Sequence, residues 1–143
     1  MLSSCGYTAV SSTDKSVVQM TKYKSNEEQI IVIQKDIQKG LAVIHEHLDN
    51  GIPIIVGVDH SLGDTGNVDE TTDHWILIVG RKTDADGIHF LFFDPQTGNK
   101  SIGTSDKNRL TVQEDYTLKG SYRVGSKYEK KYCVTMVRPT KNK

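Results

Sequence analysis

The sequence predicts an α+β domain in which N-terminal helices pack on an antiparallel β-sheet. Three observations support this class: the chain has 143 residues, 36% of them are hydrophobic, and a helical pattern near the start is followed by strand-like segments. A chain of this length and apolar content can fill one two-layer core. We therefore expect a single domain over residues 1–143, and the sequence leaves open that this is the C-terminal part of a longer natural chain.

The helical pattern lies ahead of the first strong strand. A short helix is predicted over residues 5–11, and a longer amphipathic helix over residues 25–48, broken or shifted near Gly40. Its apolar residues recur at spacings of three and four, as on one face of a helix: Ile30, Ile33, Ile37, Leu41, Ile44 and Leu48. Asn50-Gly51 predicts its end, because glycine tolerates the left-handed backbone that is common after a helix.

Strand-like segments fill the rest of the chain. The β-branched run Ile52–Val58 predicts a buried strand. Two further runs, His74–Gly80 and Ile88–Asp94, are joined by a turn-rich segment and predict an antiparallel hairpin. Between these strands, residues 59–73 form a polar loop of a length that is more often functional than structural. Later strands are expected over residues 109–114, 121–124 and 132–137.

The chain is neutral, but its charges are segregated. Its 18 Lys and Arg residues balance 18 Asp and Glu residues. Residues 59–94 contain eight acidic and two basic side chains, whereas the segment from Tyr116 onward contains eight basic side chains and one acidic side chain. A net charge of zero argues against a nucleic-acid-binding domain, which normally has a basic excess, and against a disordered chain. The acidic loop over residues 59–73 would favour basic or amine-bearing ligands.

Several other classes of protein are disfavoured. No apolar run approaches the roughly 20 residues needed to cross a bilayer, so no membrane span is expected. The first residues lack the basic and apolar regions of a signal peptide, and the compartment stays open, with secretion from a bacterium as one alternative. Two cysteines are too few for a disulfide framework. The loop over residues 59–73 lacks calcium and zinc motif spacing, so we expect no metal and no cofactor.

Three residues have the chemistry of a catalytic cysteine site: Cys5, His74 and Asp94. A thiol is a weak nucleophile at its usual pKa of about 8.5 and becomes effective when an imidazole stabilises its thiolate. A carboxylate can in turn orient the imidazole. If the hairpin turn is centred between residues 83 and 86, His74 faces residues 94–96. His74 and Asp94 should then lie side by side on one face of the sheet.

The strings "SSCGYTA", "GIPIIVGV", "DHWILIVGR" and "FLFFDPQTG", in this order, resemble the papain-like cysteine peptidases. They are most similar to the bacterial peptidase domains that remove double-glycine leaders from bacteriocins. The resemblance spans about Cys5 to Gly98 and implies a papain-like fold, with Cys5 as nucleophile, His74 as general base and acid, and Asp94 as its orienting partner. The glutamine that usually precedes the cysteine is missing, and the backbone N–H of Cys5 at a helix start is expected to supply one oxyanion donor.

The resemblance implies a thiol-dependent hydrolase of peptide or amide bonds that needs no cofactor. Its substrate would be a peptide or the peptide part of peptidoglycan, and a protein inhibitor is a further expected partner. His60, Asp73 and Trp75 are near His74 in the sequence and are expected to form a substrate rim. Two alternatives stay open: an inactive papain-like binding domain, and a small α+β interaction module in which His74 and Asp94 are not hydrogen-bonded.

The remaining histidines and the second cysteine favour structural roles. Cys133 lies in the alternating strand pattern "KKYCVTMV" and is expected to be a small core residue. His45 and His47 lie two residues apart on the predicted helix, so they face different directions and do not form a metal pair. His89 is expected on the opposite face of its strand from Asp94.

Overall fold

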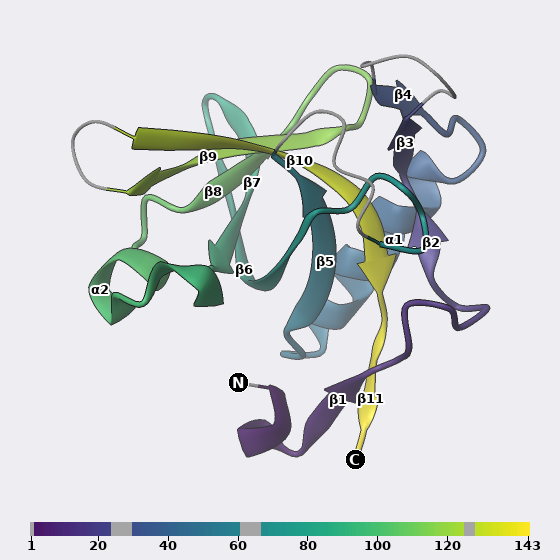
Figure 1. The fold of residues 1–143 in the computed structure, drawn as a ribbon, viewed down its shortest axis with the longest axis horizontal. Coiled ribbons are helices and arrows are strands. Elements are labelled where there is room, and N and C mark those ends of the chain that lie inside the picture. The colour runs from purple at the N-terminus through teal and green to yellow at the C-terminus, as the bar shows by residue number, and fades with distance from the viewer. Residues whose placement is uncertain (1, 24–29, 61–66, 125–127) are drawn as a thin grey trace.

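In residues 2–23, 30–60, 67–124 and 128–143, which are the residues that the computed structural model describes, six antiparallel strands close into a barrel (Figure 1). Each strand pairs with the next along the chain, and the last pairs with the first. These strands are β5 (Ile54–Asp59), β6 (His74–Asp84), β7 (Gly87–Phe93), β8 (Arg109–Val112), β9 (Leu118–Val124) and β10 (Tyr128–Arg138). The predicted mixed α+β class is confirmed, and the predicted antiparallel sheet closes into a barrel.

Closure of the barrel depends on a close backbone approach at Gly120. This residue pairs with Leu110 of β8 on one side and with Tyr132 of β10 on the other. A Cβ atom at Gly120 would lie 2.1 Å from the carbonyl oxygen of Arg109. Any larger residue would therefore push β8 away from β9, and a glycine inside a strand often marks such a contact.

The strand β10 is shared by three neighbours. Its first half pairs with β9, and its second half pairs with β5 on the opposite edge. Where β9 has ended, the short strand β2 (Val18–Gln19) pairs with β10 at Met136 and Val137. The longer strand thus ties the N-terminal segment to the barrel.

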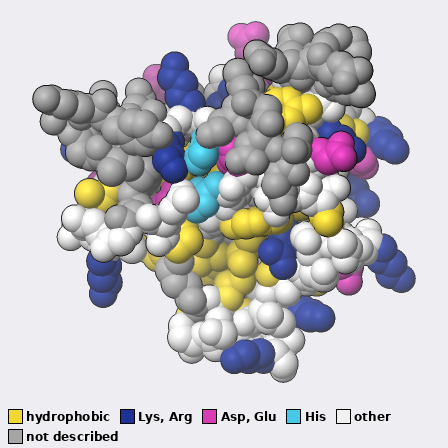
Figure 2. Space-filling view, in the orientation of Figure 1, with side chains coloured by type: hydrophobic (Ala, Val, Ile, Leu, Met, Phe, Trp, Pro, Cys, Tyr) yellow, Lys and Arg dark blue, Asp and Glu magenta, His cyan; other side chains and the backbone are white. Residues whose placement is uncertain are grey.

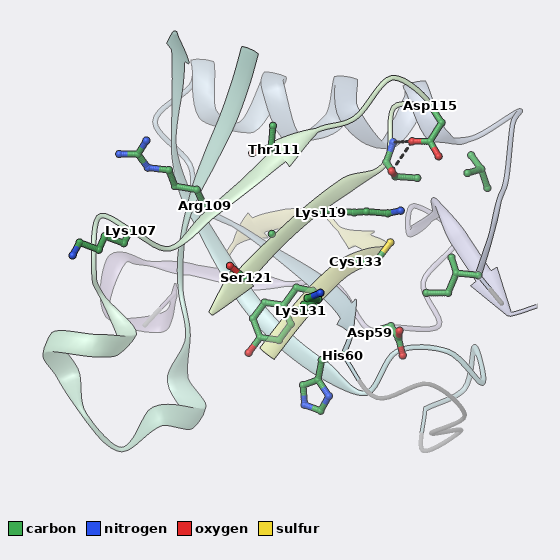
Figure 3. Close-up of a pocket in the computed structure, with 15 residues that line it drawn as sticks. Asp59, His60, Lys107, Arg109, Thr111, Asp115, Lys119, Ser121, Lys131 and Cys133 are labelled. Atoms are coloured by element: carbon green, nitrogen blue, oxygen red, sulfur yellow. Dashed lines mark hydrogen bonds between the residues drawn. The ribbon is translucent and has the colours of Figure 1, made fainter. Parts of the chain in front are cut away.

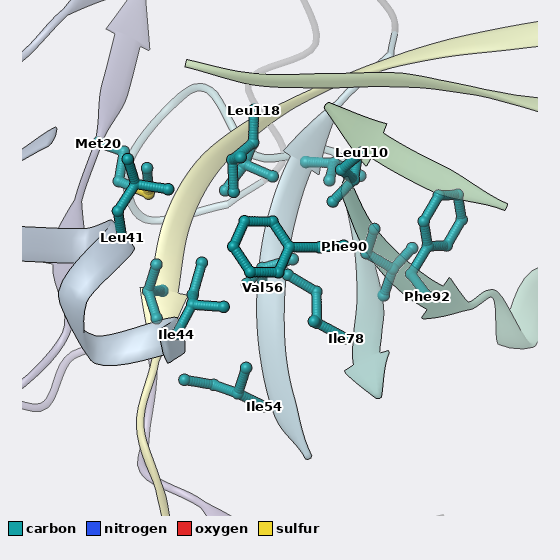
Figure 4. Packing of buried hydrophobic residues seen from close by; sticks show 14 of the residues in the cluster. Met20, Leu41, Ile44, Ile54, Val56, Ile78, Phe90, Phe92, Leu110 and Leu118 are labelled. Atoms are coloured by element: carbon teal, nitrogen blue, oxygen red, sulfur yellow. The ribbon is translucent and has the colours of Figure 1, made fainter. Parts of the chain in front are cut away.

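The helix α1 (Ile37–Asp49) packs over the barrel and completes its core. Leu41 and Ile44 of this helix contact the cluster that contains Ile54 and Phe90 (Figure 4). Burial of this apolar surface is the main stabilising contribution of the helix. The buried cluster is formed by Val18, Met20, Ile37, Leu41, Ile44, Ile54, Val56, Val58, Ile76, Ile78, Phe90, Phe92, Leu110, Leu118, Tyr132, Val134 and Val137.

The prediction of a helix is wrong for the N-terminal part of the segment over residues 25–48. Residues Ile30–Val32 form strand β4, which pairs with β3 (Thr21–Tyr23). The β-branched run favours a strand once a partner strand is present, and this pairing overrides the helical spacing. Residues 25–29 of the predicted helix lie outside the described residues.

The predicted break at Gly40 is also wrong, whereas the predicted helix end is confirmed. A Cβ atom at Gly40 would lie 2.5 Å from Cγ of Met20, so this glycine allows the helix to pack closely on the β2–β3 segment. The helix is capped at Asn50, and Gly51 has a φ of 70°, in the left-handed region.

The chain begins with a short 3₁₀ helix, η1 (Leu2–Cys5), followed by strand β1 (Tyr7–Ala9). This strand pairs with β11 (Thr140–Asn142), so both ends of the chain meet below the barrel in Figure 1. The predicted helix over residues 5–11 is therefore wrong. Gly6 turns the chain at a φ of 81°, and the pairing with β11 holds the next residues extended.

The hairpin of β6 and β7 forms as predicted. Its turn joins Asp84 to Gly87, and a bulge between Ile78 and Gly80 shifts the register by one residue. The last paired residues at the open end of the hairpin are Leu77 and Phe93, and His74 and Asp94 lie beyond them. Two short helices, η2 (Pro95–Thr97) and α2 (Lys100–Gly103), then lead to β8.

Candidate active site

The structure brings His74 and Asp94 together, as the hairpin register predicts. His74 is the first residue of β6, and Asp94 directly follows β7 and caps η2. Nε2 of His74 lies 3.0 Å from Oδ1 of Asp94, and both residues are buried. This contact contradicts the alternative of an interaction module without a His74–Asp94 hydrogen bond.

Two further donors hold the Asp94 carboxylate. The Tyr132 hydroxyl donates to Oδ2 at 2.5 Å, and the backbone N–H of Gln96 donates to Oδ1 at 2.9 Å. Burial by itself would raise the pKa of Asp94, but the hydrogen bonds from His74, Tyr132 and Gln96 outweigh it and lower this pKa below its usual value. Asp94 is therefore an anion that can fix the orientation of the imidazole and stabilise its charged form.

A second histidine–carboxylate pair lies beside the first. Nδ1 and the backbone N–H of His60 both lie 3.0 Å from Oδ2 of Asp73. Nζ of Lys130 lies 3.1 Å from Nε2 of His60 and donates to Oε1 of Gln96, also at 3.1 Å. An ammonium group can only donate, so Nε2 of His60 is an acceptor and the ring proton is on Nδ1.

Tyr132 connects the two pairs. The ring of His60 stacks on the ring of Tyr132, with centroids 5.9 Å apart and planes 18° apart. The centroids of His60 and His74 are 6.1 Å apart. Tyr132 escapes sequence reasoning because it lies 38 residues from Asp94 and reaches it through barrel closure. The available signal is the spacing of two residues between Lys130 and Tyr132, which puts both side chains on the same face of β10.

Trp75 has a different position from the other expected rim residues. It faces outward from β6, and the guanidinium carbon of Arg138 lies 4.8 Å from its ring centroid, a cation–π contact. Trp75 and Pro95 line an apolar hollow of about 440 Å³, together with Leu2 and Tyr7 from the N-terminal segment. Figure 2 shows histidine side chains next to a hollow that is lined by hydrophobic side chains.

Cys5 ends η1 and is exposed. Oγ of the adjacent Ser4 lies 4.0 Å from its Sγ. Among the described residues, no hydrogen bond joins Cys5 to His74. Because Cys5 closes a 3₁₀ helix rather than opening an α-helix, the expected oxyanion donor at a helix start is wrong. Leu2 and Ser3 nevertheless line the same hollow as Trp75 and Pro95.

Cys133 is the buried core residue that the strand pattern predicts. Burial raises the pKa of its thiol to about 11, so the thiolate is scarce near neutral pH. Its sulfur lies 4.0 Å from the carbonyl oxygen of Val134. Cys133 is therefore a poor nucleophile near neutral pH.

The described aspartates of residues 59–73 form hydrogen bonds within the protein, and their expected role as an acidic rim stays a prediction. Asp59 accepts a hydrogen bond from the Tyr23 hydroxyl, and Asp73 contacts His60. Asp69 is buried and accepts hydrogen bonds from Gln19 and from the Thr72 hydroxyl. These contacts hold the loop to the barrel, and Asp59 also lines a groove beside β10. Residues 61–66 lie outside the described part of the chain.

The other histidines contact residues away from Asp94. His89 lies within 2.9 Å of both the Asp84 carboxylate and the Thr111 hydroxyl. His45 lies 2.5 Å from Arg81, while His47 lies 2.8 Å from the carbonyl oxygen of Val43. Within the described ranges, no three His, Cys, Asp or Glu side chains are placed to hold a metal ion.

A mixed α+β barrel domain with a buried histidine–aspartate pair and an exposed cysteine near the start of the chain has the residue types of a cysteine peptidase. Residues 3–124 match the model of the Peptidase_C39 like family, so the chain belongs to this family of papain-like cysteine peptidases, which is related to the bacteriocin-processing peptidases. No curated protein and no solved structure matches the chain. In the part of the chain that the structure describes, the helices are too short or too polar to span a bilayer.

Proposed function

We propose that the chain hydrolyses peptide or amide bonds with Cys5 as the nucleophile, His74 as general base and acid, and Asp94 as the positioning carboxylate. The observation that carries the proposal is the hydrogen bond between His74 and Asp94. The Asp94 carboxylate also accepts hydrogen bonds from the Tyr132 hydroxyl and the Gln96 backbone. An ionised carboxylate can only accept a hydrogen bond, so Nε2 of His74 carries the proton that it donates to Asp94. Nδ1 of His74 is then the nitrogen that exchanges a proton with the thiol.

The reaction would proceed through a thioester. The Cys5 thiol transfers its proton to Nδ1 of His74, and the thiolate attacks the carbonyl carbon of the scissile bond. His74 then donates this proton to the leaving amine as the C–N bond breaks. Water then attacks the thioester while His74 takes up a proton from the water. The C–S bond breaks to release the free acid, and His74 returns the proton to the Cys5 thiolate. The anionic Asp94 stabilises the imidazolium in both halves of the reaction.

The position of the N-terminal segment supports Cys5 as the nucleophile. The segment is held by β1 and β11, and its residues Leu2 and Ser3 share a hollow with Trp75 and Pro95. Trp75 and Pro95 directly follow His74 and Asp94 in the chain. The 3₁₀ helix that ends at Cys5 therefore lies near the residues that follow His74 and Asp94.

The test compares Cys5→Ala with Cys133→Ala, using a peptide library and a peptidoglycan-derived tetrapeptide as substrates and mass spectrometry to identify products. We expect Cys5→Ala to lower hydrolysis by at least about a thousandfold, whereas Cys133→Ala keeps it. Iodoacetamide near neutral pH should label Cys5 much faster than Cys133. Equal, slow labelling of both thiols, or hydrolysis that survives Cys5→Ala, would contradict the proposal and favour a binding domain.

A further inference from the structure

A groove of about 960 Å³ runs along the outer face of β8, β9 and β10 and reaches His60 and Tyr132 (Figure 3). Tyr132 donates a hydrogen bond to Asp94, and His60 lies beside His74. One end of this groove therefore lies near the histidine–aspartate pair, although neither His74 nor Asp94 lines it. The groove is separate from the apolar hollow under Trp75, because the two sets of lining residues do not overlap.

The strand register places two cations on either side of a serine in this groove. Arg109 of β8 pairs with Ser121 of β9, and Ser121 pairs with Lys131 of β10. Adjacent strands are about 4.8 Å apart, so the two cationic residues start about 10 Å apart across the small serine. Long side chains on both sides of a small hydroxyl residue leave space for a carboxylate between them.

Neither cation is neutralised by a carboxylate of the described residues. Nε of Arg109 donates to the carbonyl oxygen of Asp106 at 3.1 Å, which uses one of its five N–H donors. Lys131 is exposed. Within the residues that the structure describes, no carboxylate forms an ion pair with Arg109 or Lys131. An incoming carboxylate would thus meet two available positive charges.

The charges along the groove favour a single acidic group over a polyanion. In Figure 3, Lys107 and Arg109 lie toward one end, and Asp115 lies toward the other. Hydrogen bonds from the Thr117 hydroxyl and backbone, together with nearby Lys119, lower the pKa of Asp115, so this carboxylate is ionised, and a second carboxylate, Asp59, also lines the groove. A nucleic acid that filled the groove would place phosphates against this carboxylate.

We propose that this groove binds an acidic side chain of the substrate peptide between Arg109 and Lys131, a specificity that rests on the proposed function. The groove reaches His60, whose ring lies 6.1 Å from that of His74, and an extended peptide advances about 3.3 Å per residue, so a few peptide residues would connect the bound side chain to the scissile bond. The site therefore selects peptides that carry Asp or Glu on one side of the cleavage point.

Binding is tested without turnover by nuclear magnetic resonance on a ¹⁵N-labelled Cys5→Ala variant. The probes are acetyl-(Glu-Gly)₃-amide and its Gln counterpart, titrated to millimolar concentration. The Glu peptide should shift the amide signals of Arg109, Ser121 and Lys131, and the Gln peptide should bind at least about tenfold more weakly. Equal affinities, shifts confined to other surfaces, or no shifts with the Glu peptide would each overturn the proposal.

Matched charge variants complete the test in the same Cys5→Ala background. Arg109→Gln/Lys131→Gln should weaken binding of the Glu peptide about tenfold. Lys15→Gln/Lys39→Gln removes the same charge outside the groove and should leave binding unchanged. Equal losses in both double variants, or tighter binding of an oligothymidylate than of the Glu peptide, would overturn the proposal. Binding that persists while the intact chain hydrolyses nothing would reject the proposed function and leave the groove assignment standing.

Discussion

Asp94 accepts hydrogen bonds from His74, Tyr132 and the Gln96 backbone, and together they lower the pKa of its carboxyl group against the effect of burial. A carboxyl with a lowered pKa in the folded state stabilises the fold when it is ionised. Its contribution is complete above the unfolded pKa of about 3.9 and is lost as the pH falls through the lower folded pKa. The site thus stabilises the barrel at neutral pH and ceases to do so in acid.

Tyr132→Phe tests this coupling at a single atom. The substitution removes the hydroxyl donor to Asp94 and leaves a buried carboxylate oxygen with one partner fewer. We expect the free energy of unfolding at pH 7 to fall by about 2 kcal/mol, the usual value of a hydrogen bond to a charged group. Urea denaturation from pH 7 downward measures it, and the loss should shrink as the pH falls through the range in which Asp94 titrates.

The matched control is Tyr116→Phe, which changes an exposed tyrosine. It should alter the unfolding free energy by less than about 0.5 kcal/mol at any pH. If both variants were equally stable, or if the loss at Tyr132 were the same at every pH, the hydroxyl would not act through the charge of Asp94.

At the residue scale, sequence reasoning finds the parts of the site that are near one another along the chain. His74 and Asp94 flank one hairpin, so strand register alone places them together. Tyr132 and Lys130 come from a strand that reaches the site after the barrel closes. Their contribution depends on pairing between distant segments, which local patterns do not encode.

At the element scale, the strand runs are predictable because β-branched and aromatic residues alternate along them. The strand predicted over Ile52–Val58 is β5, which lies at Ile54–Asp59. The helices are less predictable. Ile30–Val32 has helical spacing relative to α1, yet it pairs with Thr21–Tyr23, because a partner strand satisfies its backbone. The presence of a partner strand, β3, thus decides between the helix and the strand that the same residues allow.

The closed barrel predicts a specific cost at Gly120. A Cβ atom in Gly120→Ala would overlap the backbone oxygen of Arg109 at 2.1 Å, and a backbone atom cannot rotate away. We expect a loss of about 3 kcal/mol in the free energy of unfolding, measured by urea denaturation. Gly80→Ala is the control within β6, because its Cβ atom would meet the Leu91 side chain at an ordinary 3.7 Å.

Gly80→Ala should change the stability by less than about 1 kcal/mol. Equal stabilities of the two variants would show that β8 and β9 have room to separate at Gly120. In that case, closure of the barrel would depend on other contacts than this backbone approach.

At the scale of the whole molecule, the two ends of the chain hold one another. Tyr7 pairs with Asn142, and the backbone N–H of Lys143 donates to the carbonyl oxygen of Gly6 at 3.0 Å. The segment that carries Cys5 is therefore positioned by the last residues of the sequence. The barrel itself does not use these residues.

Deletion of residues 141–143 separates the two roles. Without its partner strand, β1 no longer fixes the position of η1, and we expect Cys5-dependent hydrolysis to fall by at least about tenfold. The melting temperature should change by less than about 4 °C, because the core is untouched. Circular dichroism and the peptide-library assay measure the two quantities. Full activity after the deletion would mean that Cys5 is positioned by other contacts.

The pairing of consecutive strands in the barrel has a consequence for the order of folding. Each of the contacts from β5 to β10 joins neighbours in the sequence, so hairpins can form early and independently. The pairing of β10 with β5 instead closes a long loop, from Ile55 to Arg138, and must follow the hairpins. Closure of this loop is expected to be the slow step in refolding. Closure of the barrel also brings Tyr132 to Asp94. The last strand pairing to form, between β10 and β5, is therefore the one that completes the site.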